Sequence, residues 1–357
     1  MIKRLGDIAT YVNGYAFKPS DRGDKGLPII RIQDLTGNSY DLGYYDGIYP
    51  SKIEVNDGDI LISWSGSLGI YIWNHGKALL NQHIFKVVFD KEEVNKQYYV
   101  FAVQYKLQEM ISKTHGATMK HIVKKDFNNI LIPVPTLEMQ SKMANVLSKI
   151  NTIISARQKQ IKMLDELIKA RFVELFSGVE DEDKLINLCT FIDYRGKTPE
   201  KAESGLPFIT AKNVKMHHMS FETQEFISKE TYDKVMTRGF PRIGDVVFTT
   251  EAPLGNVCRI PFIETEFYIG QRIITMQTKL LEPAYLEYAL SSDYFKRKIV
   301  AKSSGSTVTG IRSKLLEQLT IPVPPRALQK QFAAFIVQID KSKLMKFLDI
   351  FINQHLS

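Results

Sequence analysis

The sequence predicts an α+β protein in which two duplicated β-rich domains are separated by two long helices packed as an antiparallel coiled coil. Three observations lead to this fold. The first half of the chain recurs in the second half, short apolar runs between turn residues fill each copy, and each copy ends in a long segment without glycine or proline. A length of 357 residues is enough for two domains.

The repeat is an ordered series of short matching motifs. Because the matches keep their order along the chain, chance similarity of turn residues does not explain them. We therefore predict two equivalent domains at residues 1–135 and 178–324, each followed by a helical segment, at 136–177 and 325–357. The matching motifs are Gly26-Leu27-Pro28 with Gly205-Leu206-Pro207, Gly58-Asp59-Ile60 with Gly244-Asp245-Val246, Gln82 with Gln271, Gly116-Ala117-Thr118 with Gly305-Ser306-Thr307, Ile132-Pro133-Val134-Pro135 with Ile321-Pro322-Val323-Pro324, and Gln140 with Gln329.

The sequence of each domain predicts short strands and one helical segment. Runs of apolar residues bounded by Gly, Pro, Asn and Asp predict strands. The helical interludes are expected near residues 96–113 and 283–302. The strands are expected at residues 27–32, 59–63, 84–89, 207–210, 245–249 and 272–277.

The two helical segments carry apolar stripes. In the first segment the apolar residues step alternately by four and three, which is typical of a coiled-coil seam, and a helix of this length spans roughly 60 Å. Burial of the two helices against each other explains both stripes, and the duplication favours an antiparallel pair; pairing of each helix with another chain is the alternative. The residues expected to pack between the helices are Met143, Leu147, Ile150, Ile154, Ile161, Leu164, Ile168, Phe332, Ile336, Ile339, Phe347 and Phe351.

Composition favours a cytoplasmic protein with an anionic partner. The formal charge is +8, which points weakly to nucleic acid. Most of this surplus lies on the helical segments, so the domains themselves are near neutral. Two cysteines cannot build a disulfide framework or a structural zinc site. No apolar stretch is long enough to cross a bilayer or to serve as a signal peptide.

Motifs for catalysis are missing from the sequence. It contains no Gly-x-x-x-x-Gly-Lys-Ser/Thr loop, no Gly-x-Ser-x-Gly elbow and no His-Glu-x-x-His pair. The clustered carboxylates of a nuclease and the Asn/Asp-Pro-Pro-aromatic motif of an adenine methyltransferase are also missing. We therefore predict no catalytic residue, no metal ligand and no cofactor in this chain.

Basic and polar residues suited to DNA gather in matching parts of both copies. The windows 110–125 and 294–316 contain no acidic residue, and each holds a Gly-x-Thr turn whose backbone can approach phosphates. Loops that differ between the copies carry side chains able to bond base edges, although each one could equally be an ordinary turn residue. The candidate DNA contacts are Arg31, Gln33, Ser65, Ser67, His83, Lys113, Thr118, Lys120, His121, Lys124, Lys212, Asn213, Thr249, Thr250, Arg272, Lys302, Ser306, Thr307, Thr309 and Arg312.

Over nearly its whole length the chain resembles the specificity subunit of type I restriction-modification systems. The motifs that carry the resemblance are Leu5-Gly6-Asp7, Gly58-Asp59-Ile60-Leu61, Asn81-Gln82-His83, and, in both copies, a Gly-x-Thr turn followed by Ile-Pro-Val-Pro, a glutamine and a long helix. One departure is that the second helix stops at Ser357, short of the place where the repeat would end it. The alternatives are a shortened spacer, weaker docking of one subunit, or a short natural variant.

The resemblance implies a non-catalytic subunit with two target recognition domains, each reading half of a bipartite site in double-stranded DNA. It implies that the helices set the spacer and dock two modification (adenine-N6 methyltransferase) subunits, to which restriction (ATP-dependent translocase/nuclease) subunits are added. S-adenosylmethionine, ATP and Mg²⁺ would then belong to the partners. The alternatives are a coiled-coil scaffold with protein- or glycan-binding domains and, less in keeping with the missing motifs, a self-contained restriction enzyme.

Overall fold

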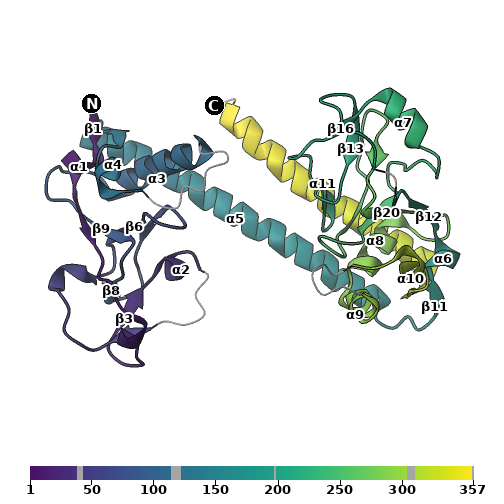
Figure 1. Ribbon diagram of the computed structural model, residues 1–357, viewed down its shortest axis with the longest axis horizontal. Helices are drawn as coiled ribbons and strands as arrows, with labels where there is room; N and C mark the ends of the chain where they lie inside the picture. Colours follow the sequence, from purple (N-terminus) through teal and green to yellow (C-terminus); the bar gives the residue numbers. More distant parts are fainter. Residues whose placement is uncertain (38–42, 114–121, 197, 304–309, 356–357) are drawn as a thin grey trace. The chain divides into compact units, whose positions relative to one another are not determined.

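The computed structural model describes residues 1–37, 43–113, 122–196, 198–303 and 310–355, with only the backbone described at 110, 112, 113 and 344–355. The chain divides into two compact units, Met1–Arg157 and Gln158–Ser357. Each unit combines strands, short helices and part of a long helix, as the α+β class predicts (Figure 1). The boundary between the units lies within the first long helix, in the segment predicted to separate the two domains.

The described part of unit 1 contains the strands β1 (Ile2–Arg4), β2 (Thr10–Asn13), β3 (Leu27–Ile30), β4 (Tyr44–Tyr45), β5 (Glu54–Val55), β6 (Ile60–Ser63), β7 (Gly69–Ile72), β8 (Ala78–Leu80), β9 (Ile84–Val88) and β10 (Leu131–Pro133). One antiparallel sheet has the order β2-β9-β6-β7. A second has the order β4-β3-β8-β5, in which β3 and β8 are parallel. The ribbon β1-β10 closes the unit next to the long helix.

The described part of unit 2 contains β11 (Glu182–Lys184), β12 (Thr190–Asp193), β13 (Leu206–Ile209), β14 (Val214–Lys215), β15 (His218–Met219), β16 (Phe226–Ile227), β17 (Val246–Thr249), β18 (Val257–Arg259), β19 (Tyr268–Ile269), β20 (Ile273–Gln277) and β21 (Thr320–Pro322). The sheet β12-β20-β17-β18 and the ribbon β11-β21 repeat the arrangement of unit 1. The second sheet, β16-β13-β19, again pairs two strands in parallel. The hairpin β14-β15 completes the unit.

Helices cover these sheets and join them to the ribbons. In unit 1, α3 packs on β7, and in unit 2, α8 packs on β18. The helical interlude expected at 283–302 is two helices, because the Ser292 side chain accepts a hydrogen bond from the Phe295 amide and starts a new helix. The helices are α1 (Leu5–Ile8), α2 (Ile32–Leu35), α3 (Lys96–Lys113), α4 (Lys124–Asn128), α6 (Leu185–Leu188), α7 (Lys229–Val235), α8 (Pro283–Ser291), α9 (Asp293–Lys302) and α10 (Ser313–Glu317), with 3₁₀ turns η1 (Pro19–Asp21) and η2 (Ser51–Ile53).

The repeated Gly-Asp motif builds the turn that enters the central strand of each unit. Gly58 and Gly244 have φ of +84° and +87°, a conformation that favours glycine. The Asp59 carboxylate accepts the Asn56 amide at 2.9 Å, and the Asp245 carboxylate accepts the Arg242 amide at 2.7 Å. The motif therefore recurs because it makes the same turn twice.

The strand after this turn is buried on both faces. Ile60 and Ile62 of β6 belong to the core that α3 covers, whereas Leu61 belongs to the core beneath the second sheet. Successive side chains of a strand point to opposite faces. A strand buried on both faces is therefore a continuous apolar run, as the sequence shows at β6 and β17.

A buried glutamine fastens each long helix to its own domain. Gln140 accepts the Asn95 amide at 2.9 Å and donates to the Pro135 carbonyl at 2.9 Å. Gln329 makes the same two bonds, with the Glu282 amide and the Pro324 carbonyl. Both side chains are almost fully buried. The repeated glutamine therefore has a structural role in both copies.

The long helices are α5 (Leu137–Phe176) and α11 (Arg326–His355). Within unit 2 the final turns of α5 pack against the start of α11 in antiparallel direction (Figure 1). Phe172 stacks edge-on against Phe332 with 5.4 Å between ring centroids. Asp165, earlier in α5, pairs with Lys343, later in α11, at 2.6 Å. This part of the predicted antiparallel packing is present in the structure.

The predicted seam is not buried along its whole length. Leu164 and Ile168 pack in one cluster with Phe332, Ile336 and Ile339. Leu147 and Ile150 are only half-buried, and Met143, Ile154 and Ile161 are 41%, 47% and 39% exposed. Between 151 and 163 only Arg157 is not exposed. A periodic stripe identifies the apolar face of a helix, but it does not show how far another helix covers that face. The side chains of Phe347 and Phe351 lie outside the described residues.

Candidate DNA interface

The turn after β6 and the turn after β17 are held by the same side-chain hydrogen bond. The Ser63 hydroxyl donates to the Ser67 carbonyl at 2.5 Å. The Thr249 hydroxyl donates to the Pro253 carbonyl at 2.6 Å. Both hydroxyl-bearing residues are fully buried. The predicted role of Thr249 as a DNA contact is therefore corrected, because its side chain closes a turn instead.

Backbone hydrogen bonds extend this correspondence to two neighbouring segments. The Trp64 amide donates to the His83 carbonyl at 3.1 Å, and the Thr250 amide donates to the Arg272 carbonyl at 3.0 Å. The carbonyls of Trp64 and Thr250 accept the amides of Ile122 and Ile311, at 2.9 and 3.0 Å. We name this arrangement the turn frame: residues 63–67, His83 and Ile122 in unit 1, and residues 249–253, Arg272 and Ile311 in unit 2.

The turn frame of unit 1 carries two aromatic side chains. The Trp64 ring meets the His83 ring edge-on with 4.9 Å between centroids. His83 has φ of +72°, so its backbone is left-handed. Trp64 Nε1 and His83 Nδ1 are buried, and neither has a hydrogen-bond partner within the described structure. Such groups are rare in native proteins and call for a specific explanation.

The turn frame of unit 2 carries an ion pair instead. Arg272 Nε lies 3.0 Å from Glu251 Oε1, and their side chains are 54% and 43% exposed. Thr250 is 3% exposed, and its hydroxyl donates to the Arg272 carbonyl at 3.3 Å. The prediction of Thr250 as a DNA contact is corrected for the same reason as that of Thr249. Glu251 was not among the predicted contacts, although it stands in a loop that differs between the copies.

Other candidates in unit 1 lie apart from the turn frame or at its edge. Arg31 is half-buried and pairs with Asp34 at 3.2 Å, which fixes the first turn of α2. Gln33, on the same turn, is exposed. Ser65 is half-buried and Ser67 is exposed within the turn frame, and Lys124 is exposed at the start of α4. These positions leave Gln33, Ser67 and Lys124 accessible to a ligand.

Other candidates in unit 2 divide into one buried and three exposed residues. Asn213 is 3% exposed, and its amide binds the Ser220 and Thr223 carbonyls while its oxygen accepts the Thr210 amide. The prediction of Asn213 as a base contact is corrected, because both its side-chain nitrogen and its side-chain oxygen are hydrogen-bonded to the backbone of its own loop. Lys212, Lys302 and Arg312 are exposed. Lys212 lies 4.0 Å from Glu225.

Part of the predicted interface falls outside the residues that the structure describes. For Lys113 only the backbone, at the end of α3, is described. The other predicted contacts outside the described residues are Thr118, Lys120, His121, Ser306, Thr307 and Thr309.

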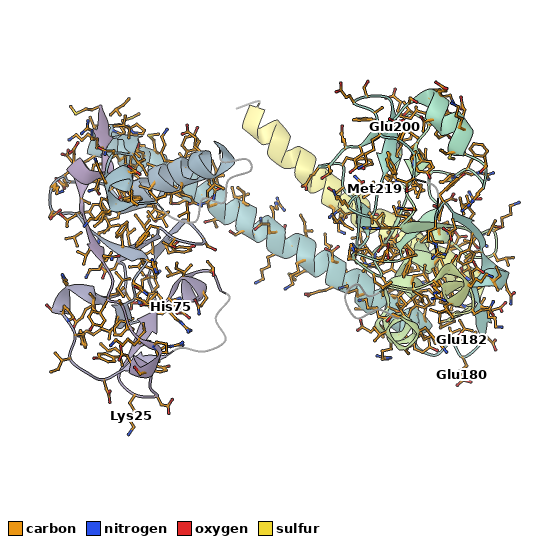
Figure 2. All side chains as sticks on the ribbon, viewed as in Figure 1. Lys25, His75, Glu180, Glu182, Glu200 and Met219 are labelled. Atoms are coloured by element: carbon orange, nitrogen blue, oxygen red, sulfur yellow. The ribbon has the colours of Figure 1, made fainter. Side chains whose placement is uncertain are left out.

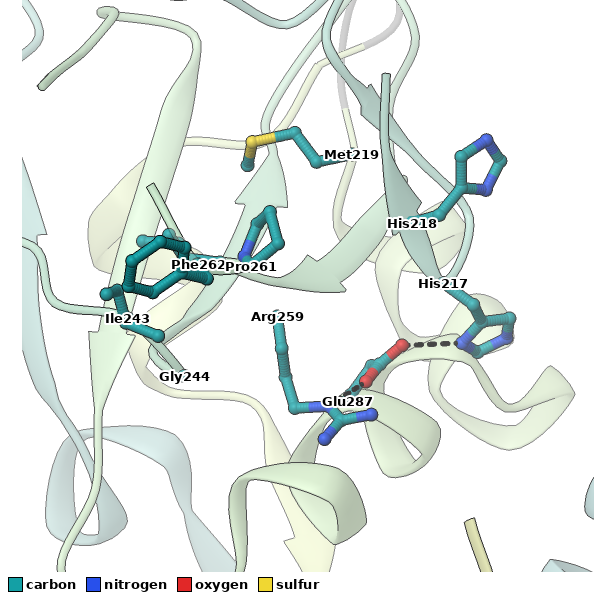
Figure 3. A pocket seen from close by; sticks show the side chains of 10 residues that line it. His217, His218, Met219, Ile243, Gly244, Arg259, Pro261, Phe262 and Glu287 are labelled. Atoms are coloured by element: carbon teal, nitrogen blue, oxygen red, sulfur yellow. Dashed lines mark hydrogen bonds and ion pairs between the residues drawn. The ribbon is translucent and has the colours of Figure 1, made fainter. Parts of the chain in front are cut away.

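A cavity of about 470 Å³ lies at the other end of β18, away from the turn frame (Figure 3). Glu287 of α8 is 1% exposed there and accepts bonds from His217 Nδ1 at 2.9 Å and Arg259 Nε at 2.6 Å. His217 also stacks on Tyr288, with 4.2 Å between centroids. In the sequence, His217-His218 stands in a polar stretch between short apolar runs, a pattern typical of a solvated loop or a loop that faces DNA rather than of a metal site. The structure shows that His217 is anchored to a buried carboxylate.

No metal-binding cluster of three or more His, Cys, Asp or Glu residues occurs within the described ranges. Both cysteines are buried, and burial raises the pKa of each thiol to about 12. The thiols are therefore neutral at physiological pH and unreactive. No described helix is long and apolar enough to span a membrane.

Comparison with known proteins identifies the family to which this architecture corresponds. A sequence model described as "Type I restriction modification DNA specificity domain" matches residues 1–163 and 184–352. The chain belongs to this family. The two matches are the two copies of the repeat, so the family assignment covers both units. It supports a DNA-specificity role and does not favour the scaffold alternative.

Individual relatives give the same assignment. The chain is 26% identical to the type I restriction enzyme MjaVIII specificity subunit of Methanocaldococcus jannaschii, over 95% of this chain and 85% of that protein. It is 23% identical to the EcoBI specificity subunit of Escherichia coli, over 94% of this chain and 78% of that protein. Relatives of this kind are specificity subunits, in keeping with a non-catalytic role.

Solved structures share the fold. The S subunit of a type I restriction-modification system from M. genitalium superposes with a TM-score of 0.56 and 14% identity, over 98% of this chain and 91% of that one. A chain from a structure on the assembly and conformational transition of the type I R-M system gives 0.54 and 18%, over 100% and 94%. Both confirm the predicted duplicated architecture with long helices.

Proposed function

We propose that this specificity subunit reads a bipartite site in double-stranded DNA, one half with each unit, while the long helices set the unread spacer. The observation that carries the proposal is the turn frame. The same hydrogen bonds hold the same backbone in both units, yet the frame carries Trp64 and His83 in one and Glu251 and Arg272 in the other. One scaffold with two different sets of side chains suits two different half-sites.

The proposal assigns the chemistry to partner subunits. Two modification (adenine-N6 methyltransferase) subunits would dock on the helices, and restriction subunits would complete an ATP-dependent nuclease in the cytoplasm. S-adenosylmethionine, ATP and Mg²⁺ would be bound by these partners. The exposed apolar side chains along α5, among them Val146 and Ile153, support a role of this helix in docking.

The test is DNA binding by the assembled methyltransferase, with each half-site scrambled in turn and with base pairs added to the spacer. Each scramble should weaken binding by about 10³-fold or more, toward the non-specific level. A change of spacer length should be as harmful. Indifference to both scrambles would contradict the proposal. Incubation of the isolated chain with DNA and Mg²⁺ should give no cleavage, which separates it from a self-contained nuclease.

A further inference from the structure

From the turn frame of unit 2 we infer that Arg272, oriented by Glu251, is a specificity-determining residue that contacts a guanine in the half-site read by this unit. The inference rests on the proposed function and narrows it to one side chain and one kind of base. Nothing else in the described part of unit 2 combines an exposed guanidinium, a fixed backbone and a neighbouring carboxylate on a turn whose counterpart in unit 1 differs.

The backbone of Arg272 is fixed on both sides. Its carbonyl accepts the Thr250 amide and the Thr250 hydroxyl, and the residue stands directly before β20 in the centre of the main sheet. The Thr250 carbonyl in turn accepts the Ile311 amide. A side chain on such a rigid base can read a base edge, because base readout requires a fixed register.

The Arg272 side chain is exposed, but an ion pair restrains its conformation. Its Nε is held 3.0 Å from Glu251 Oε1, while the side chain remains 54% exposed. An arginine held in this way can present its planar fork to the O6 and N7 acceptors of guanine, the commonest specific contact in the major groove. Exposed Arg312 lies next to Ile311 on the same frame and adds positive charge there.

The carboxylate decides between a base and a phosphate as the partner of Arg272. A phosphate brought to Arg272 would also approach Glu251, and the two negative charges would repel each other. A guanine edge offers neutral acceptors instead, and a carboxylate can accept the N4 amino group of a cytosine. The ion pair therefore fits a base edge better than the DNA backbone.

The corresponding position in unit 1 is occupied by His83. The backbone bond is the same, but the side chain packs against Trp64 and its Nδ1 is unpaired within the described structure. A change of side chain on a common frame is what different base preferences require. We therefore assign the same task to His83 in the other half-site, without assigning its base.

The experiment compares variants of the assembled methyltransferase on a panel of DNA duplexes, each with one base pair of the recognised site replaced. Arg272→Lys keeps the positive charge but removes the planar guanidinium that can donate two hydrogen bonds to one guanine. It should lose about 10- to 100-fold discrimination at one G·C pair of one half-site, with the salt dependence of binding unchanged. His83→Ala should lose discrimination only in the other half-site. Methylome sequencing of cells with each variant should show the same relaxed positions.

The matched control is Lys234→Ala. Lys234 is also an exposed cation of unit 2 paired with a carboxylate, Glu230, at 2.6 Å, but it lies on α7. It should leave every base preference unchanged. The Arg272 side chain is 54% exposed and Glu251 is half-buried at the surface, so Arg272 variants should fold, and a thermal melt checks this directly.

Three outcomes separate the inference from the proposed function. Unchanged base preferences in Arg272→Lys and Arg272→Ala would overturn the inference while leaving bipartite recognition intact. Uniform weakening on all duplexes by Arg272→Ala, with a salt slope reduced by about one, would make Arg272 a phosphate contact and also overturn it. Failure of the unaltered complex to discriminate between half-sites would instead overturn the proposed function.

Discussion

In both units a helix packs against the edge strand of the main sheet, but the side chains at the matching positions are charged in one unit and apolar in the other. In unit 2, α8 places Glu287 against Arg259 at the end of β18. In unit 1, the matching positions on α3 and β7 hold Val100, which is buried, and Ile72, which is 38% exposed. The comparison teaches that the framework specifies position and backbone bonds, whereas either charged or apolar side chains can occupy these positions.

The ribbons next to the long helices differ in the same way. In unit 2, Glu182 of β11 binds Lys298 at 2.8 Å and accepts hydrogen bonds from Thr320 and Tyr294 (Figure 2). In unit 1 the ribbon β1-β10 presents Ile2 and Leu131, which are 70% and 51% exposed. At the matching positions, one unit therefore has a charged, paired Glu182 and the other an exposed Ile2; the ion pair of the unit 1 ribbon lies at the next residue, between Lys3 and Glu92 at 2.5 Å.

The two long helices give the largest expected difference between the units. Phe332 of α11 is fully buried against Phe172 and Phe176, whereas Met143, at the matching position of α5, is 41% exposed. Phe332→Ala should lower the free energy of unfolding of unit 2 by about 4 kcal/mol through the lost burial and the cavity left behind. Met143→Ala should change unit 1 by less than about 1 kcal/mol.

This prediction can be measured in the full chain, because Trp64 and Trp73 are its only tryptophans and both lie in unit 1. Tryptophan fluorescence during denaturant unfolding therefore follows unit 1, and far-ultraviolet circular dichroism follows both units. Phe332→Ala should shift the second signal and leave the first in place. Equal shifts for Phe332→Ala and Met143→Ala would contradict the difference in packing.

The buried carboxylate of unit 2 should give the next largest effect. Glu287→Val installs the residue of unit 1 and leaves Arg259 and His217 without their partner, at a cost of about 3 kcal/mol. Glu287→Val combined with Arg259→Ile reproduces both side chains of unit 1 and should recover most of that loss. Circular dichroism in denaturant measures both variants. A double variant as unstable as the single one would show that the framework does require the ion pair.

The smallest effect should be the pH dependence that Glu182 gives to the stability of unit 2. Burial alone raises the pKa of Glu182, but hydrogen bonds from Lys298, Thr320 and Tyr294 outweigh it and leave the pKa below its ordinary value. A carboxyl with a lowered pKa in the folded state stabilises the protein above its unfolded pKa, and this stabilisation is lost as the pH falls through the folded value.

Glu182→Gln removes the charge with little change of shape and therefore isolates this effect. The variant should melt below the unaltered chain at pH 7, and the gap should close as the pH falls below about 4.5, near the ordinary pKa of glutamate. Ile2→Gln on the ribbon of unit 1 serves as the control, with a gap that stays constant. A gap for Glu182→Gln that does not narrow at all between pH 7 and pH 3 would assign the effect to packing rather than charge.

The sequence was sufficient for features that depend on local pattern. The matching motifs identified the duplication, the continuous apolar runs identified β6 and β17, and the absence of glycine and proline placed α5 and α11 within one or two residues of their bounds. These features follow from backbone propensity and from burial on one or both faces, which periodicity reports directly.

Features that depend on distant partners could not be predicted. Asn213 and Thr249 have side chains that could bind a base edge. In the structure, both side chains donate hydrogen bonds to backbone carbonyls of their own loops instead. His217 reads as a loop residue because its partner, Glu287, stands 70 residues later. A sequence shows which groups can form hydrogen bonds, and only the folded chain shows which of them already have a partner.

The glutamine joints at Gln140 and Gln329 have a mechanical consequence. Each glutamine binds two backbone groups and so fixes the start of its helix to the domain that precedes it. Neither junction can therefore serve as a hinge, and a force that turns either domain is passed on to its helix. In α5 the side chains from 151 to 163 are nearly all exposed, so little side-chain packing holds this stretch straight. We therefore expect any bending to occur within the helix rather than at its ends.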